Sequence, residues 1–240
     1  MPSHASIVPR SALFRALTLL PALVLFGCGA TDERAEARLE SELQSVLGPA
    51  DRYEVDVDGV TSDATAADRV HAIGYRVRPE RGPVIDRLEI ELRGIRYDRD
   101  RKRLERAESA TAVAWITTAD LGDFLEMQDG VRDAVVTLQA PDSAFIRMRP
   151  DLPGVPTLPG VSVEAAGQLH GNGPWLECRV SDVRAVGLNL GDSFARRISQ
   201  LINPLVDLTD LPMRLEVSSV RVEGRRIRVD ATGDAVPLNP

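Results

Sequence analysis

Hydrophobic and polar residues alternate along much of this chain, which is the pattern of β-strands with one buried face. The alternation is clearest where Leu88, Ile90 and Leu92 interleave with charged residues. Similar segments between turn residues predict strands at 53–60, 70–77, 110–116, 131–138, 145–148, 161–169, 175–183, 213–222 and 226–231. Asn172-Gly173 favours a tight hairpin turn between two of these segments. Most of the chain is therefore predicted to form antiparallel strands.

Three other segments repeat apolar residues every three or four positions, which is the period of an amphipathic helix. The first is Glu33–Leu47, and Gly48-Pro49 ends it. The second begins at Thr117-Thr118-Ala119-Asp120, because a threonine caps free N–H groups and an aspartate is favourable near the positive end of a helix. The third is Asp192–Asn203, which Pro204 ends or kinks. Helices beside many antiparallel strands predict the α+β class.

The first 28 residues have the order of a bacterial export signal. Arg10 and Arg15 give a basic start, and the uncharged run from Ala16 to Phe26 follows. This run is too short to span a bilayer, which needs about 20 apolar residues. Residues 1–27 are therefore predicted to be a signal peptide.

Cys28 is the predicted site of a lipid anchor. A leucine three positions earlier and a glycine directly before this cysteine resemble a lipobox, the site at which lipoproteins are cleaved and acylated. We expect a lipidated Cys28, with fatty chains such as palmitate, then a short tether over 28–33 and a single domain over 34–240. The alternative is an ordinary secretory signal that is cut after Ala30.

Composition narrows the classes of partner. The chain has a net charge of −7, so it lacks the basic surface that nucleic-acid binding needs. Its hydrophobic content of 43% is enough for a core, and 4% aromatic residues are too few for large stacking platforms. A mature chain of about 210 residues fits one domain or one elongated unit.

The residues that usually carry catalysis are sparse and scattered. Cys178, the only cysteine after the signal, lies in a predicted strand and is expected to be a buried, inert thiol. His71 and His170 are far apart in sequence, and neither lies beside a cysteine or a pair of acids. Asp56 and Asp58 share one side of a strand, where a solvated face is the simpler interpretation. We predict no catalytic residue, no metal site and no cofactor, and a hydrolase with an unrecognised site is the weakest alternative.

Several segments occur in an order that resembles a known family. They are Ala35–Leu39, Val84–Ile95, Ile116–Leu121 with Phe124-Leu125, Leu211–Leu215 and Val220–Gly224. In this order they resemble the LmeA-like phospholipid-binding family of exported bacterial envelope proteins. The resemblance implies binding of phospholipid, including phosphoinositide-type lipid, and a role in envelope lipid or lipoglycan maintenance. It also implies a tubular lipid-binding fold, in which a curved, mostly antiparallel sheet wraps around one long helix, here Phe194–Val206, with one or two shorter amphipathic helices.

An apolar trough between sheet and helices is the expected binding site. An acyl chain loses no hydrogen bond there, and each buried methylene contributes about 0.8 kcal/mol. The predicted acyl contacts are the apolar residues of the two later helices: Leu121, Phe124, Leu125, Phe194, Ile198, Leu201, Ile202 and Leu205. Arg196 and Arg197 are predicted headgroup contacts, although a solvated helix face explains them as well. A fully collapsed core that uses the same apolar side chains is the alternative.

These observations favour an exported lipoprotein that is tethered to a membrane of the cell envelope through Cys28. It is predicted to bind or shuttle a phospholipid or related amphiphile and so to support envelope lipid maintenance. The alternative function is that of a structural or adaptor lipoprotein, whose exposed strand edges pair with an envelope protein partner.

Overall fold

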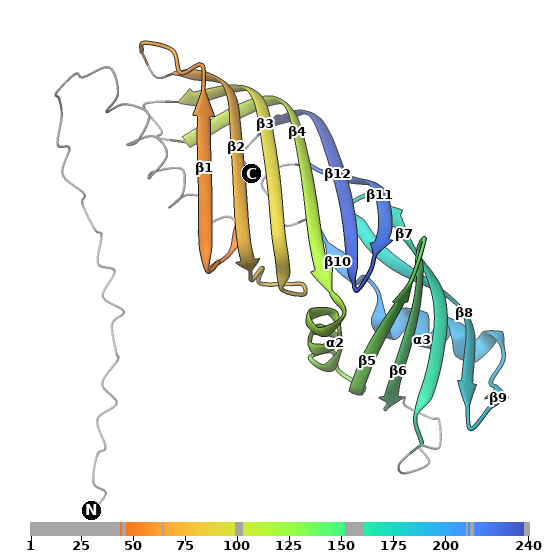
Figure 1. Cartoon of the computed structure of the whole chain (residues 1–240). Helices are drawn as coiled ribbons and strands as arrows, with labels where there is room; N and C mark the ends of the chain where they lie inside the picture. The colour runs from red at the N-terminus through yellow and green to blue at the C-terminus, as the bar shows by residue number, and fades with distance from the viewer. Residues whose placement is uncertain are drawn as a thin grey trace, which may run out of the picture.

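The computed structural model describes residues 44, 47–63, 65–98, 103–151, 161–209, 211 and 214–237. These residues form open, curved antiparallel sheets and two short helices (Figure 1). Strands account for 61% of the structure and helices for 13%, so the fold is mostly β and matches the predicted α+β class only in part. Most strands run further than the alternation predicted, but those at 52–58 and 216–223 are shorter, and the helix at 192–202 ends one residue earlier than predicted.

The first sheet has the strand order β1-β2-β3-β4-β12-β11. Its strands are β1 (Arg52–Asp58), β2 (Ala66–Val77), β3 (Ile85–Asp98), β4 (Arg103–Thr117), β11 (Glu216–Glu223) and β12 (Arg226–Pro237). Every neighbouring pair is antiparallel. The last two strands of the chain therefore complete the sheet that its first four strands begin.

The second sheet has the order β10-β8-β7-β6-β5, and β9 also pairs with β8. Its strands are β5 (Val131–Gln139), β6 (Ser143–Pro150), β7 (Val163–Asn172), β8 (Trp175–Ala185), β9 (Leu188–Asn189) and β10 (Val206–Asp207). The turn between β7 and β8 is Gly173-Pro174, because Asn172 pairs with Trp175. This corrects the predicted Asn172-Gly173 turn by one residue, and Gly173 supplies the positive φ of +58° that the turn needs.

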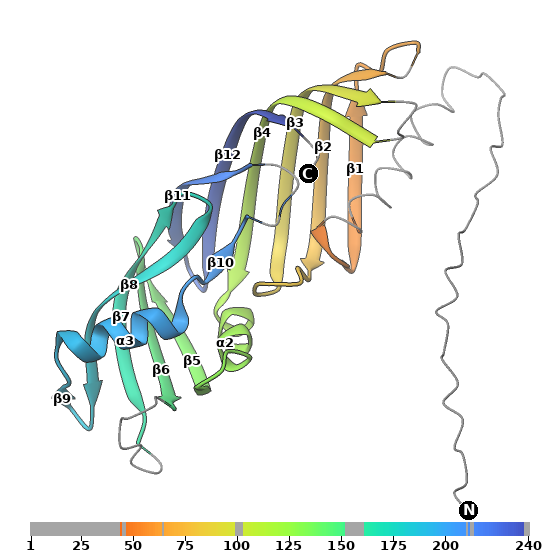
Figure 2. The ribbon, with the colours of Figure 1, turned by 180° about the vertical axis from the view of Figure 1, so that it is seen from behind.

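The two sheets meet at β11, and together they give an elongated, curved molecule (Figures 1 and 2). The Val217 N–H donates to the Gly173 carbonyl at 2.7 Å, and the Val222 N–H donates to the Pro141 carbonyl at 2.7 Å. A Cβ atom at Gly171 would lie only 2.7 Å from a methyl of Val217. Glycine at this position therefore permits the close approach of the sheets.

The two faces of the first sheet differ in chemistry. One face, which we call the inner face, carries an apolar row across the strands, since Ala72 pairs with Ile90, Ile90 with Ala112, and Ala112 with Ala231. All four are buried. The opposite, outer face is charged and carries ion pairs between neighbouring strands. Such exposed ion pairs add little stability, so burial of the inner face drives folding of this sheet.

The helix α2 (Thr118–Glu126) begins as the sequence predicted. Thr117 is the N-cap, and its hydroxyl accepts from the Asp120 N–H and donates to Asp120 Oδ2 at 2.5 Å. Arg76 Nη1 donates to the same carboxylate oxygen at 2.8 Å, and Asp120 is only 5% exposed. Glu126 accepts from the Ala134 N–H at 2.9 Å, which holds the other end of the helix on β5. The helix is thus fixed between the end of β2 and the second sheet.

The helix α3 (Asp192–Ile202) packs on β8, and neither described helix is wrapped by the first sheet. The predicted helix Phe194–Val206 is therefore wrong at its end, because Val206 lies in β10. Asn203 leaves the helix with extended angles, as the residue before Pro204 is disfavoured in helical geometry. Its side chain then donates to and accepts from the Cys178 backbone, at 2.9 and 2.8 Å.

The predicted features of the N-terminus fall outside the described residues. These are the signal peptide 1–27, the lipid anchor at Cys28, the tether and nearly all of the helix Glu33–Leu47. Within the described ranges, neither helix has the length and apolar character needed to cross a membrane.

Candidate functional site

An apolar cavity lies on the inner face of the first sheet. It holds about 710 Å³ of space between atoms, including the part that opens to solvent. Its floor comes from side chains that point inward from β3, β4 and β12: Ile85, Leu88, Ile90, Ala112, Ala114, Ile116, Val229 and Ala231. Further lining comes from Leu47 and from the segment between β2 and β3.

Alanines at the centre of the floor leave room in this cavity. Ala114 pairs with Leu88 on one side and with Val229 on the other. Ala112 likewise lies between Ile90 and Ala231. Larger side chains at these two positions would fill the space, so the small residues of β4 keep the cavity open.

The residues after α3 cover this floor. Val206, Leu208, Leu211 and Leu215 line the cavity from this side. The segment is fixed to the second sheet because Val206 pairs with Leu176 in β8. The strand β10 lies between the two sheets (Figure 2). The cavity forms where this part of the chain faces the first sheet.

Two charged residues contribute to the lining, Arg81 and Asp207. Asp207 Oδ1 accepts from Trp175 Nε1 at 3.1 Å and from the Thr209 hydroxyl and N–H at 2.6 and 2.9 Å. Burial raises the pKa of Asp207, but the hydrogen bonds from Thr209 and Trp175 and the charge of Arg81 outweigh it and lower the pKa. An ionised carboxylate and a guanidinium thus border an otherwise apolar space, which suits an amphiphile.

The predicted acyl contacts lie elsewhere. Leu121 and Leu125 of α2, Ile198 and Ile202 of α3, and Leu205 are buried, whereas Phe124, Phe194 and Leu201 are half-buried against the same core. These residues pack where α2 meets β5 and α3 meets β8, and none of the eight lines the apolar cavity. The β3, β4 and β12 side chains that line this cavity were not among the predicted contacts, although the alternating alanines of 110–114 indicated small side chains on one face of a strand.

The predicted headgroup contacts are also remote from the cavity. Arg196 and Arg197 are exposed on α3, and Arg196 Nη2 donates to the Ser193 hydroxyl at 3.2 Å. Neither guanidinium lines the cavity. The arginine that lines it is Arg81, in the segment between β2 and β3.

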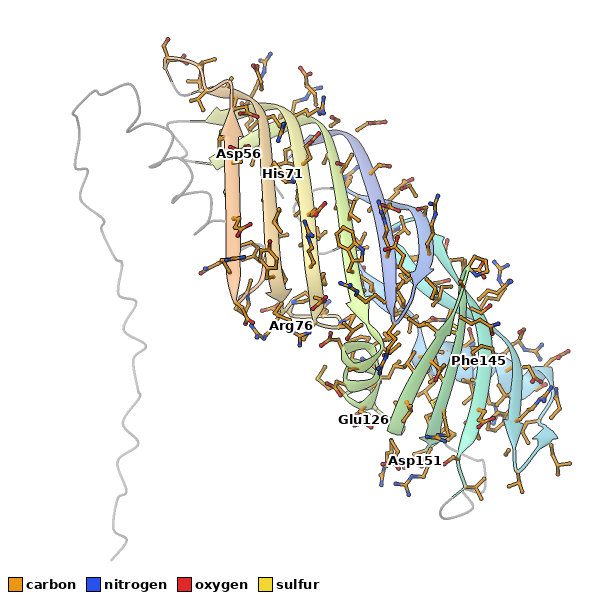
Figure 3. The ribbon with its side chains drawn as sticks, in the orientation of Figure 1. Asp56, His71, Arg76, Glu126, Phe145 and Asp151 are labelled. Atoms are coloured by element: carbon orange, nitrogen blue, oxygen red, sulfur yellow. The ribbon has the colours of Figure 1, made fainter. Side chains whose placement is uncertain are left out.

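The paired carboxylates of β1 belong to the charged outer face (Figure 3). Arg69 lies 3.7 Å from Asp56 and 3.5 Å from Asp58, and it also contacts Glu91 at 3.7 Å. His71 is the cross-strand partner of Asp56. Each carboxylate is therefore paired with a cation on an open surface, which is the solvated strand face that the sequence favoured.

A second cavity, which is polar, lies between the β7–β8 hairpin and the end of α3. Strand pairing places Glu177 opposite His170, with 3.6 Å between Oε2 and Nε2. The Ser199 hydroxyl, in the same cavity, donates to the Cys178 carbonyl, and His170 Nδ1 has no hydrogen-bond partner. A serine–histidine relay is thus not assembled here. Over the described residues, no cluster of three or more His, Cys, Asp or Glu side chains could hold a metal ion.

The Cys178 thiol is expected to resist modification in the folded protein. It is buried in β8, and burial raises its pKa to about 11, so roughly one thiol in a thousand is ionised at pH 8. In the full chain with Cys28→Ser, which leaves Cys178 as the only thiol, iodoacetamide should label the unfolded chain completely and the native chain negligibly. Rapid labelling of the native chain near neutral pH would contradict this assignment.

Comparison with known families matches residues 29–232 to the family described as LmeA-like phospholipid-binding. The match covers most of the chain and confirms the resemblance seen in its segments. Searches of curated proteins and of solved structures found no match.

Proposed function

Because the chain belongs to the LmeA-like phospholipid-binding family, we propose that it holds the acyl chains of a phospholipid in the apolar cavity. The cavity carries the proposal, since aliphatic side chains from three strands line an apolar space that opens to solvent. Each methylene that leaves water for this surface contributes about 0.8 kcal/mol.

The charged residues of the lining orient the lipid. The Arg81 guanidinium suits a phosphate oxygen, and the Asp207 carboxylate suits an ammonium group. A headgroup that carries both charges complements this pair better than a purely anionic one. The acyl chains then extend between β4 and the segment that follows α3, away from water.

The N-terminal sequence supports action outside the cytoplasm. A basic start, a short apolar run and the lipobox order before Cys28 are typical of an exported lipoprotein. A lipid anchor on Cys28 keeps the binding domain close to a membrane of the envelope. This arrangement suits a protein that shuttles phospholipid and thereby supports envelope lipid maintenance.

The test is to purify the protein without detergent and to analyse what it carries. Native mass spectrometry and lipid extraction should find bound phospholipid, and delipidated protein should take up a fluorescent acyl probe that phospholipid displaces. Absence of both signals would overturn the proposal. The adaptor alternative predicts a filled core and a stable protein complex in pull-downs from membranes, with no exchangeable lipid.

A further inference from the structure

Three large apolar side chains are exposed on one hairpin. Val186 is 84% exposed, Leu188 72% and Leu190 37%. We call these three residues the apolar tip. They belong to the β8–β9 hairpin and the residue after it, at the end of the molecule opposite β1 (Figures 1 and 2). Single exposed apolar residues are ordinary, but a group on one projection marks an interaction site.

The turn of this hairpin is built around an unfavourable residue. Ala185 pairs with Leu188, so the turn is Val186-Gly187, with φ of +51° and +77°. Two-residue turns with two positive φ angles favour Asn-Gly or Asp-Gly. A β-branched residue is rarely found in this left-handed region. The turn itself does not explain a valine here, whereas a role for its exposed side chain does.

The two sides of the hairpin differ in polarity. The Asn189 side chain donates to Asp182, and Arg184 Nε pairs with the same carboxylate at 2.7 Å. Because side chains alternate along a strand, Leu188 and Leu190 lie on the side opposite Asn189. The polar contacts hold the hairpin in shape while its apolar side chains remain in solvent.

The charge around the apolar tip is locally cationic in an acidic chain. Residues 182–197 contain three arginines, Arg184, Arg196 and Arg197, and two aspartates, whereas the whole chain has a net charge of −7. All three arginines are exposed, and the latter two lie on α3, which begins directly after the hairpin. Guanidinium groups bind phosphate through paired N–H donors. This segment therefore complements the phosphates of lipid headgroups.

We propose that the apolar tip inserts into the surface of a phospholipid membrane. The three side chains enter the boundary between headgroups and acyl chains, and the arginines of α3 contact headgroup phosphates. This contact requires neither the anchor at Cys28 nor the apolar cavity. It places the end of the molecule remote from β1 against the lipid surface.

An added indole tests this insertion in the full chain, and its signal is the difference from the unmodified chain, which carries Trp115 and Trp175. Leu188→Trp places an indole on the apolar tip, and Met127→Trp is the matched control, because Met127 is 71% exposed on the far end of α2. Both proteins are mixed with vesicles of phosphatidylcholine and phosphatidylglycerol in equal parts, whose acyl chains carry bromine. We expect the indole of Leu188→Trp to shift to shorter wavelength and to be quenched, and that of Met127→Trp to be unchanged. Equal responses from the two would overturn the proposal, as would a shift of Leu188→Trp that depends on protein concentration without vesicles.

A second variant separates insertion from turn structure. Val186→Asn relieves the backbone at a positive φ and should raise the melting temperature by about 2–4 °C. In the Leu188→Trp background, it should at the same time reduce quenching by the brominated lipid, because one inserted side chain is lost. A lower melting temperature would show that Val186 serves the fold, and unchanged quenching would show that its side chain does not insert; either result would overturn the proposal.

Discussion

Ala114→Trp is expected to abolish phospholipid binding and to leave the fold intact. Ala114 lines the apolar cavity between Leu88 and Val229, and an indole there extends into the space proposed for the acyl chain. Excluding about four methylenes, at about 0.8 kcal/mol each, should weaken binding of a fluorescent acyl probe roughly two hundredfold. Co-purified phospholipid, measured by extraction, should fall to background.

Val113→Trp is the matched control, because it adds the same side chain to the same strand on the outer face. It should bind lipid like the unmodified chain. The circular dichroism of both variants should retain the strand signal, since an open cavity accepts the added volume better than a filled core does. If Ala114→Trp still carried lipid at the original level, the acyl chain would have to lie outside this cavity.

Most strands were predictable because one face of each is buried in the core. Alternation predicted the centre of β3, but it did not predict where the strands end. The predicted strand began only at 110, yet Arg106 pairs with Arg96 inside the sheet. Charged residues can lie within a sheet where they form ion pairs or where the strand ends are exposed. Such positions can be recognised only once the partner strand is known. The two-residue strands β9 and β10 likewise exist only through pairing with β8.

The site was harder to predict than the strands. An apolar stripe on a helix shows that one side is buried, but it does not show against what. Ile198 and Leu121 are therefore buried as expected, but in the core of the second sheet and not beside the apolar cavity. The space above Ala112 depends on residues of β3, β12 and the segment after α3, which are far apart in sequence. The volume left between their side chains can be judged only when it is known that these elements lie together.

Ile198→Ala is expected to lower stability strongly and to leave lipid binding unchanged. Ile198 is fully buried between α3 and the second sheet, so its truncation should cost about 2–5 kcal/mol of unfolding free energy. In a chain of this size, each kcal/mol corresponds to roughly 2–4 °C of melting temperature, which calorimetry resolves. Because the side chain does not line the apolar cavity, the probe affinity well below the transition should match that of the unmodified chain.

Gln200→Ala, an exposed change on the same helix, is the control for Ile198→Ala and should alter neither stability nor probe affinity. The pair of measurements distinguishes the two positions considered for the lipid. Loss of probe affinity in Ile198→Ala, at a temperature where the variant is fully folded, would return the acyl chain to the contact between α3 and the second sheet. Retained affinity together with a large loss of stability would assign the second sheet to structural support and the first sheet to binding.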